Sequence, residues 1–576
     1  MFTMRLIHKY LSIFAVSYSI FISISPVTRA NTISKQSQGM VVSAHSLASE
    51  AGINILQKGG NAVDAAVATA FAISVVEPFS AGIGGGGFLL LRSAQTGEIK
   101  ALDFREWAPR LARRNMFLDS QGKPRLDASK NGYLAVGVPG TVAGLYEVHR
   151  RYGKISWSEV IEPAIKLADR GFAVSEFFIL EIQKHEKQIL NNPATKAIFT
   201  RNGKAYNSGE LLIQTDLANT LKSIAKDPQN FYTGNIAKAI AADMAKNNGI
   251  ITLEDLKSYR PTWRSPLCDN FRQYRICSMP PPSSGGVHLL EILHIIGNTD
   301  IKSWGRYNPD TLHLMIEAMR IAYADRSQYL GDPKFVQVPV NALTNAKYGQ
   351  YRHQQIDMKK AAPFQKLQPV DAETLKRFSP GKESTDTSHL TVVDNQKNVV
   401  SLTFTINGRF GASVTVPGTG ILLNNEMDDF AIAPNVPNLF GLVGGDANSI
   451  APGKIPLSSM TPIIVTENDK LRLAGGSPGG STIITTMVQI ILNILVDNMD
   501  AKAAVKAPRL HHQWLPDKLL VEKNGFDAAT LTELRRRGHE IVEMKSWGNA
   551  NVIVVTSDGV LEGAADPRGE GKSIGF

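Results

Sequence analysis

Helical periodicity dominates the first 340 or so residues of the chain. Apolar positions over 43–78 recur at helical spacing and predict two helices, the first ended by Gly59–Gly60 and the second capped by Asn61. Most of 140–260 has the same periodicity, and 309–333 predicts one long amphipathic helix. This half of the chain is therefore predicted to be mainly helical.

The second half of the chain changes to short alternating strands. A polar, lysine-rich stretch at 345–386 shows little periodicity and predicts a mobile connector. Residues 388–407 then alternate as two strands around a short polar turn, which predicts a hairpin. Further strands and the helix-like run STIITTMVQIILNILV follow. Helices, then strands, then helices predict a layered protein of mixed helices and sheets.

Three glycines ahead of one predicted strand imitate a nucleotide-binding motif. Gly82, Gly84 and Gly87 match G-x-G-x-x-G, but a dinucleotide site needs a strand before the glycines and a helix after them. Here a helical run precedes the glycines and FLLLR, which follows, reads as a strand. We expect these glycines to relieve backbone crowding at the tight start of a strand, and we expect no cofactor.

The first thirty residues have the pattern of an export signal. Arg5 and Lys9 precede an apolar run of about 15 residues, and Thr28 and Ala30 occupy the −3 and −1 positions of a signal-peptidase site. We place the cleavage after Ala30. A periplasmic or secreted protein follows, with no membrane span in its mature form; an uncleaved anchor is the alternative.

The composition is typical of a globular protein, with 43% apolar and 20% charged residues. The formal charge of +10 falls to near +7 once three basic residues of the signal are removed, and the remaining basic residues are spread along the chain. Two short basic runs, at 112–114 and 535–537, predict solvated faces, so we expect no nucleic-acid partner.

The two cysteines lie at matching positions of a predicted hairpin. Cys268 and Cys277 flank DNFRQYRI, and a two-residue turn at Arg272–Gln273 makes them a non-hydrogen-bonded pair, in which Cβ atoms approach most closely. Export supplies an oxidising compartment. We therefore predict a disulfide between them.

The stretch STDTSHLTVVD, residues 384–394, holds five hydroxyl side chains, a histidine and two aspartates. Asp386, Ser388 and His389 make a poor triad, because successive strand residues point to opposite faces. Thr387 can act differently: a cut before it would create an α-amine that takes the proton of its own hydroxyl. From the residues alone, a polar start of a strand and a hidden N-terminal nucleophile both stay open.

The predicted hairpin brings further polar groups toward Thr387. A three-residue turn at Asn395–Lys397 places Thr405 opposite Thr387, whereas a four-residue turn shifts the register by one. In either register the second strand ends beside Thr387 with Thr405 and Asn407.

Ten short motifs are spread along residues 38–568. In chain order they are GIGGGGF, DFRE, MPPPSSGG, DTSHLTVVD, GILLNNEMDDF, PNLFGLVGGDAN, PLSSMTP, GSPGGS, HHQWLPD and ADPR. In sequence and order they resemble the motifs of bacterial γ-glutamyltransferases, members of the N-terminal-nucleophile hydrolases. The resemblance implies an α+β fold, a four-layer αββα sandwich built jointly by two chains cut from one precursor.

The resemblance implies that the precursor cuts itself between Asp386 and Thr387. A large subunit, 31–386, and a small subunit, 387–576, would stay together as a heterodimer. The Thr387 hydroxyl, with the new α-amine as its base, would attack the γ-carbonyl of glutathione or another γ-glutamyl compound, and Cys-Gly would leave glutathione. Water, an amino acid or a dipeptide would then take the γ-glutamyl group from the threonine ester.

The resemblance also assigns residues to the charges of the substrate. Two glycines would let backbone N–H groups approach the oxyanion, although alone they read as an ordinary turn. An arginine and two serines would bind the α-carboxylate at one end, and an amide with two carboxylates would bind the α-amine at the other. The implied site is Gly479 and Gly480 at the oxyanion, Thr405 beside the Thr387 amine, Arg105, Ser458 and Ser459 at the carboxylate, and Asn407, Glu426 and Asp429 at the amine.

A few positions depart from the family pattern. The stretch 437–448 resembles a lid loop, with Phe440 where relatives often carry a tyrosine, so the hydroxyl hydrogen bond is lost. Arg409 also differs, on the acceptor side, and Thr482 receives no role. His511–His512 lacks a third ligand at helical spacing, and we predict no metal.

Two other functions compete with a γ-glutamyltransferase that also has hydrolase activity. A glutaryl- or cephalosporin-acylase-like hydrolase of the same superfamily would have no α-amine for Glu426 and Asp429 to bind. An unprocessed, non-catalytic paralogue acting as a binding protein would not need Thr387 or Arg105. The residues favour the transferase.

Overall fold

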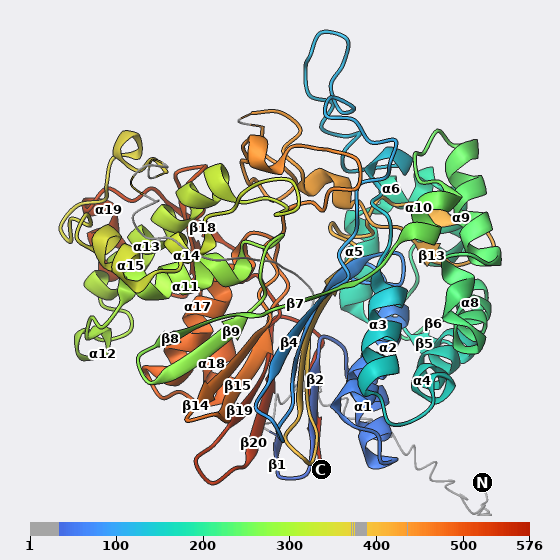
Figure 1. Cartoon of the computed structure of the whole chain (residues 1–576), viewed down its shortest axis with the longest axis horizontal. Coiled ribbons are helices and arrows are strands. Elements are labelled where there is room, and N and C mark those ends of the chain that lie inside the picture. The colour runs from blue at the N-terminus through green and yellow to red at the C-terminus, as the bar shows by residue number, and fades with distance from the viewer. Residues whose placement is uncertain (1–33, 370, 372–373, 375–388, 435) are drawn as a thin grey trace, which may run out of the picture.

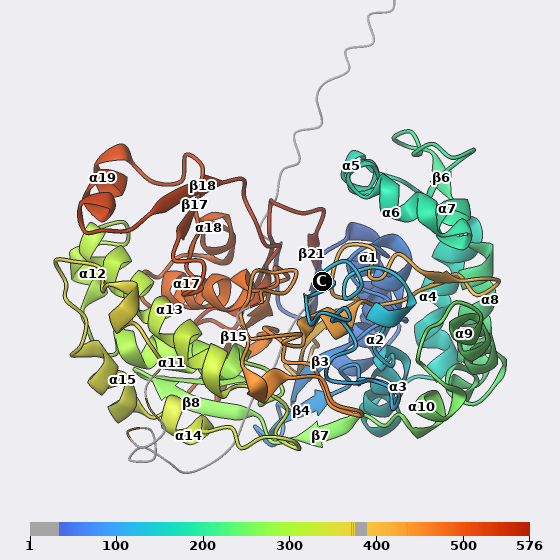
Figure 2. The same ribbon diagram turned by 90° about the horizontal axis from the view of Figure 1, so that it is seen from above.

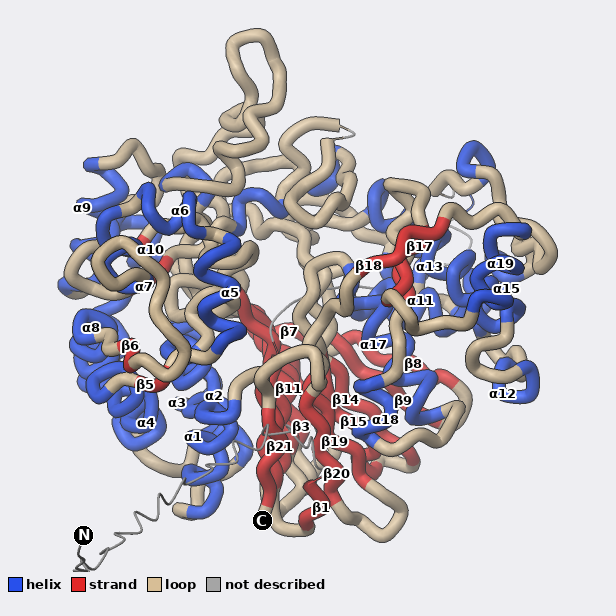
Figure 3. The backbone as a smooth tube through the Cα atoms, turned by 180° about the vertical axis from the view of Figure 1, so that it is seen from behind, coloured by secondary structure: helices blue, strands red, loops and turns tan. Residues whose placement is uncertain are grey.

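Two seven-stranded sheets lie face to face in the centre of the molecule, and helices cover the outer face of each (Figure 1, Figure 2). The computed structural model describes residues 34–369, 371, 374, 389–434 and 436–576. The predicted four-layer αββα sandwich is confirmed. Seen from behind, the strands form one central block between two groups of helices (Figure 3).

Both sheets are antiparallel throughout, and each combines strands from distant parts of the chain. Sheet A has the order β1 (Ser34–Gln36), β20 (Leu561–Ala565), β19 (Asn551–Val555), β15 (Lys470–Gly476), β14 (Ile463–Glu467), β9 (Tyr274–Ser278), β8 (Leu267–Phe271). Sheet B has the order β21 (Lys572–Gly575), β2 (Met40–Ser43), β10 (His389–Val393), β11 (Val399–Thr405), β3 (Gly86–Arg92), β4 (Ile99–Asp103), β7 (Thr262–Arg264).

The helices divide between the two outer layers by their place in the chain (Figure 1). Beside sheet B lie α1 (Ser46–Gln57), α2 (Ala62–Val76), α3 (Thr141–Tyr152), α4 (Trp157–Arg170), α5 (Glu176–Lys184), α6 (Glu186–Asn191), α7 (Pro193–Phe199), α8 (Thr215–Lys226), α9 (Asn235–Lys246) and α10 (Leu253–Ser258). Beside sheet A lie α11 (Gly285–Ile296), α12 (Ile301–Trp304), α13 (Pro309–Tyr329), α14 (Val340–Leu343), α15 (Ala346–His353), α17 (Thr482–Leu495), α18 (Ala501–Lys506) and α19 (Ala528–Arg536).

Short strands complete the molecule at its periphery. They are β5 (Phe172–Ala173) with β6 (Leu211–Leu212), β12 (Thr415–Val416) with β13 (Ile421–Leu422), and β16 (Leu510–His511) with β17 (Leu519–Glu522) and β18 (Ile541–Met544).

Alternation along the strands explains why the two sheets stack. In β3, Leu89 and Leu91 pack against the helices, whereas Phe88 and Leu90 belong to the core between the sheets. Because successive side chains point to opposite faces and both faces are covered, the central strands are apolar along their whole length. Three apolar layers result, one between the sheets and one under each group of helices.

The two helices predicted over 43–78 are present as α1 and α2. Asn61 caps α2 by accepting from the backbone N–H groups of Val63 and Asp64, and the Asp64 carboxylate closes the capping box. Every residue of α2 is buried, and the small alanine side chains of this helix allow it to pack closely on sheet B.

The hairpin of β10 and β11 has the register of the three-residue turn. His389 pairs with Thr403 and Val393 with Val399, and the Asp394 N–H donates to the Asn398 carbonyl. The register is therefore confirmed for the described residues. Thr387 and Asp386, the predicted cleavage residues, lie outside the described residues, as does the predicted export signal.

The prediction of a mobile connector from residue 345 is wrong for its first part. Residues 346–353 form α15, whose Tyr348 donates a hydrogen bond to Asp325 at 2.5 Å and whose Arg352 lies 3.5 Å from the same carboxylate. Further along, the Trp514 indole donates to the Leu367 carbonyl at 2.7 Å. The buried face of α15 carries polar side chains, so the sequence of this helix shows no apolar periodicity.

The hairpin of β8 and β9 places Cys268 directly opposite Cys277, and a disulfide joins them. The turn falls at Arg272, which has φ +55, as the two-residue turn requires. Across the part of the chain that the structure describes, no helix has the length and apolar character to cross a bilayer.

Candidate active site

One end of sheet B collects most of the predicted site residues. Arg105 follows β4, and Thr405 ends β11 opposite Gly86, the first residue of β3. The crowding expected at the glycines is present: a Cβ on Gly85 would lie 1.8 Å from the Thr405 carbonyl oxygen. The glycines therefore let the chain before β3 press against the end of β11, and no helix follows them.

Hydrogen bonds to both backbone groups of Arg105 fix the position of its main chain. Its N–H donates to Asp103 at 3.0 Å, and its carbonyl accepts from the Tyr259 hydroxyl at 2.8 Å. Asp103 is itself paired with Arg264 at 2.8 Å. These bonds fix the direction in which the guanidinium leaves the sheet edge.

The Arg105 guanidinium is fully buried between carboxylates. Its Nη1 lies 2.5 Å from Glu426, its Nη2 lies 2.7 Å from Asp429, and Glu106 lies 4.0 Å away. We call these four residues the Arg105 cluster. The sequence assigned the arginine and the acids to opposite ends of a substrate; the structure places them in direct contact, because a buried guanidinium needs counter-charges beside it.

Carboxylates outnumber the guanidinium in the Arg105 cluster. Burial raises the pKa of Glu426 well above its usual value, and Arg105 opposes this only in part. Burial likewise raises the pKa of Glu106 to about 7. A cluster of three acids and one base either holds protons or accepts a cation, so it is suited to an ammonium group.

Thr405 and Asn407 form a tight turn at the end of β11. The Asn407 N–H donates to the Thr405 hydroxyl at 2.7 Å, and Asn407 adopts φ +70, a left-handed conformation that asparagine tolerates. Its side-chain amide donates to the Asn425 carbonyl at 3.0 Å. Asn407 is thus tied to the residue that precedes Glu426.

The predicted serine pair lies against the start of α11. The Ser458 carbonyl accepts from the N–H and hydroxyl of Ser284, and the Ser459 hydroxyl accepts from Arg326 at 3.4 Å. Within the described residues the buried Ser458 hydroxyl has no hydrogen-bond partner. A buried hydroxyl of this kind is unusual in a protein interior and is suited to a ligand.

Arg326 behind the serines was missed from the sequence. It donates from Nε to the Ser284 hydroxyl at 2.9 Å and is buried on α13. Since Ser459 lies 133 positions further along the chain, no local pattern could have revealed it.

Gly479 and Gly480 lie just before α17 and both have positive φ, +141 and +55. A Cβ on Gly480 would lie 2.2 Å from the Phe440 ring, so the ring packs directly on this glycine. Thr482, which received no role, donates from its hydroxyl to the Gly479 carbonyl at 2.9 Å.

The predicted lid loop connects Phe440 to the Arg105 cluster. Asn438 donates to Asp429 at 3.0 Å, and the Leu439 N–H donates to Asp428 at 2.6 Å. Asp428 therefore anchors the loop, while Asp429 faces Arg105. Asn448, at the far end of the loop, donates to the Asp429 carbonyl at 2.7 Å and accepts from the Leu457 N–H at 2.9 Å, next to the serine pair.

The adjacent histidines His511 and His512 do not act together. His511 bonds to Thr485 and Gln513, and His512 lies 3.3 Å from Asp517. Arg409 lies over the rings of Phe79 and Phe177 and 3.5 Å from Glu181. Each of these side chains thus has its own partners.

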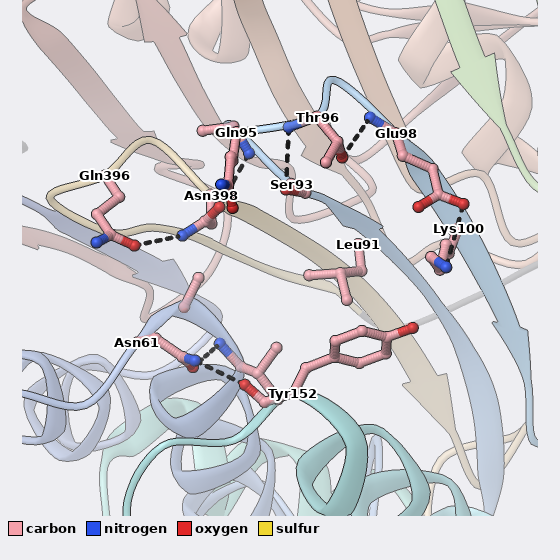
Figure 4. A pocket seen from close by; sticks show the side chains of 13 residues that line it. Asn61, Leu91, Ser93, Gln95, Thr96, Glu98, Lys100, Tyr152, Gln396 and Asn398 are labelled. Atoms are coloured by element: carbon pink, nitrogen blue, oxygen red, sulfur yellow. Dashed lines mark hydrogen bonds and ion pairs between the residues drawn. The ribbon is translucent and has the colours of Figure 1, made fainter.

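A cavity of about 750 Å³ lies at the opposite end of sheet B (Figure 4). Side chains from the turns after β3 and β10 line it, among them Ser93 and Asn398, together with Lys100 of β4, Asn61 and Tyr152. None of the predicted site residues contributes to it.

Comparison with known proteins gives one consistent result. The model of the family described as Gamma-glutamyltranspeptidase matches residues 48–576. The "Glutathione hydrolase proenzyme" of Escherichia coli (strain K12) is 46% identical over 533 residues, which cover 92% of this chain and 90% of that protein.

Solved structures of an acylase and of a gamma-glutamyltranspeptidase both superpose on this chain. Cephalosporin acylase from Bacillus halodurans superposes with a TM-score of 0.82 at 28% identity, covering 98% of this chain and 99% of that one. Helicobacter pylori gamma-glutamyltranspeptidase is 44% identical with a TM-score of 0.57, covering 59% of this chain and 96% of that one.

Proposed function

The chain belongs to the γ-glutamyltranspeptidase family, and on this premise we propose that it is a proenzyme that cuts itself before Thr387 and then acts on glutathione and related γ-glutamyl compounds. Membership makes it a γ-glutamyltransferase with hydrolase activity. The observation that carries the substrate proposal is the Arg105 cluster.

The Arg105 cluster suits the zwitterionic head of a γ-glutamyl group. The substrate ammonium would take Glu426 and Asp429 as partners, with Asn407 beside them, and the substrate carboxylate would take the Arg105 guanidinium and the Ser458 and Ser459 hydroxyls. Each buried charge exchanges one partner for another, so none is left unpaired. A ligand lacking either charge would leave a buried group uncompensated, which discriminates strongly against it.

Thr387 would supply the nucleophile and its own base. Its α-amine takes the hydroxyl proton, the oxygen attacks the γ-carbonyl, and the departing amine of the substrate receives a proton as the ester forms. Water or the amine of an acceptor amino acid or dipeptide then attacks the ester and releases the threonine oxygen. Extending the register of β10 and β11 toward residue 387 supports Thr405 as the group beside that amine.

Gly479 and Gly480 would stabilise the oxyanion of both tetrahedral intermediates. Backbone N–H groups at residues without a Cβ can approach an oxyanion closely, and one such donor contributes about 3–4 kcal/mol. Phe440 packs over this turn and is linked through Asn438 to Asp429. The lid would therefore cover the acyl group and the ammonium site together.

A cut before Thr387 would leave two subunits that remain associated. Each sheet combines strands from both sides of residue 387: β10 and β11 lie between β2 and β3, and β14 pairs with β9. Separating the subunits would break these ladders and expose the apolar layers, so we expect a stable heterodimer. An export signal at 1–30 would direct it to the periplasm or outside the cell.

The experiment starts with the purified protein on a denaturing gel. We expect two bands, and N-terminal sequencing of the smaller should begin Thr-Ser-His-Leu. Thr387→Ala should give one uncut band without activity on γ-glutamyl-p-nitroanilide, whereas the matched variant Ser388→Ala should still be cut. A single intact band that hydrolyses this substrate would contradict the mechanism.

The acylase alternative is tested on the same preparation with glutaryl-p-nitroanilide, which differs from the first substrate only in lacking the α-amine. Cleavage of the glutaryl compound at an equal or higher kcat/KM would replace the transferase with an acylase. We expect at least a 100-fold preference for the γ-glutamyl compound (about 3 kcal/mol), because Glu426 and Asp429 would otherwise stay uncompensated.

A further inference from the structure

A second buried polar cluster lies between α13 and the residues that join α19 to β18. His313 and Glu317 are one turn apart on α13, and His539 approaches them from the other side. One donor atom from each side chain lies within 4.8 Å of the others, and all three residues are buried. We call these residues the histidine cluster.

The hydrogen bonds of His313 determine which of its nitrogens is free of a proton. Its Nε2 lies 2.9 Å from the Asp357 carbonyl, which can only accept, so Nε2 carries the hydrogen. Its Nδ1 therefore has a lone pair, and this atom points at Nε2 of His539, 2.8 Å away. A histidine whose far nitrogen donates to a backbone carbonyl is arranged as metal-ligating histidines are.

Glu317 is oriented by two donors of its own. Its Oε2 accepts from the Ala362 N–H at 3.2 Å, and its Oε1 accepts from Arg320 at 2.7 Å. Arg320 also bonds to Asp517 at 2.8 Å, so two carboxylates share one guanidinium. These donors fix the Glu317 carboxylate in place, as the outer partners of a metal ligand do.

We propose that His313, Glu317 and His539 bind a borderline divalent cation, for which zinc is the reference. Two imidazoles and one carboxylate are a recurrent donor set for such ions. Ligands at about 2.0–2.1 Å in a tetrahedral site stand roughly 3.3 Å apart, so the two rings need to separate by about half an ångström from 2.8 Å.

The proposed ion would have a structural role, because its three ligands are buried and come from parts of the chain distant in sequence. His313 and His539 are 226 positions apart. The sequence predicted no metal because it offered only the neighbouring pair His511–His512; the histidine cluster exists only after folding. Metal binding at this site does not depend on the cut before Thr387, since the uncut precursor already contains His313, Glu317 and His539.

The test uses the full chain expressed with added zinc. Elemental analysis by mass spectrometry should find about one zinc per chain. Removal with a chelator should lower the Tm, and zinc should restore it. Protein prepared with Co²⁺ should show the visible absorption of tetrahedral cobalt. Folded protein that carries no stoichiometric zinc and gives no cobalt band would overturn the proposal, without any variant being needed.

Variants locate the ion. The amide of His539→Gln can still donate to Nδ1 of His313 but is a poor ligand, so zinc content should fall at least tenfold. His294→Gln is the matched control, because His294 is buried elsewhere, against the Asn270 carbonyl, and its loss should leave zinc in place. Zinc retained in His539→Gln would overturn the assignment. Thr387→Ala should keep its zinc, which separates this test from that of the proposed enzyme.

Discussion

The Arg105 cluster and the histidine cluster are both buried, and both join residues far apart in the chain, but they differ in how their charges are arranged. The first has one guanidinium among three carboxylates, at strand ends under a loop. The second has two imidazoles and one carboxylate, and His313 and Glu317 lie on one helix of 21 residues. The first can exchange charged partners when a ligand arrives; the second offers lone pairs in a fixed frame.

This difference in charge indicates which kind of ligand each buried cluster can bind. Excess charge under a loop costs stability unless a ligand compensates it, so it indicates a substrate site. Neutral donors held by regular structure cost little and suit a permanent occupant. Changes in the Arg105 cluster should therefore affect substrate affinity first, and changes in the histidine cluster should affect stability first.

Arg105→Ala should have the largest effect on activity among the substitutions that leave the chain able to cut itself. The substrate carboxylate loses its charged partner, so kcat/KM should fall at least about 100-fold, mainly through KM. Steady-state kinetics with γ-glutamyl-p-nitroanilide measures this. Arg150→Ala is the control, because Arg150 is an exposed arginine paired with Glu147 on the same helix. A normal KM in Arg105→Ala would contradict the view that the Arg105 cluster binds substrate.

Ser458→Ala should separate affinity from stability. The Ser458 hydroxyl is buried without a partner among the described residues, so removing it should leave the Tm unchanged or slightly raised. Losing its bond to the substrate carboxylate should raise KM at least about 10-fold, since hydrogen bonds to charged groups contribute roughly 1.5–3 kcal/mol.

Ser459→Ala is the variant to compare with Ser458→Ala, because the Ser459 hydroxyl already accepts a hydrogen bond from Arg326. It should lower the Tm as well as raise KM. Equal loss of Tm in both variants would show that the Ser458 hydroxyl has a partner in the free protein.

The sequence predicted those features whose signal is local. α2 was recognised because its cap, its length and its apolar positions lie within one stretch. The hairpin was recognised with two possible registers, and the structure has that of the three-residue turn. α15 was missed because its buried face is polar: Tyr348 and Arg352 pair with Asp325, which lies on another helix. Family motifs named Arg105 and Asp429 but not their contact, since 324 positions separate them.

Glu106→Gln should change how stability depends on pH. The folded pKa of Glu106 is about 7, above the unfolded value of 4.5, so its favourable contribution is complete below 4.5 and is lost as the pH rises through 7. The free energy of unfolding of the wild type should therefore fall by about 2 kcal/mol relative to the variant between roughly pH 5 and pH 8. Urea unfolding at both values measures it, and parallel curves would contradict the buried, protonated state.

Phe440→Tyr should have the smallest effect and test the lid. Phe440 packs on Gly480, and its carbonyl accepts from Gln513 at 3.2 Å, so the backbone of the loop is already held. A tyrosine hydroxyl could add one hydrogen bond near the acyl group, which contributes about 0.5–1.5 kcal/mol and so lowers KM by a factor of about 2–10. Phe440→Leu keeps an apolar cover without the ring and should raise KM. Identical KM values in all three proteins would mean that the loop closes through Asn438 and Asp429 alone, and that the Arg105 cluster, not the ring, sets the affinity.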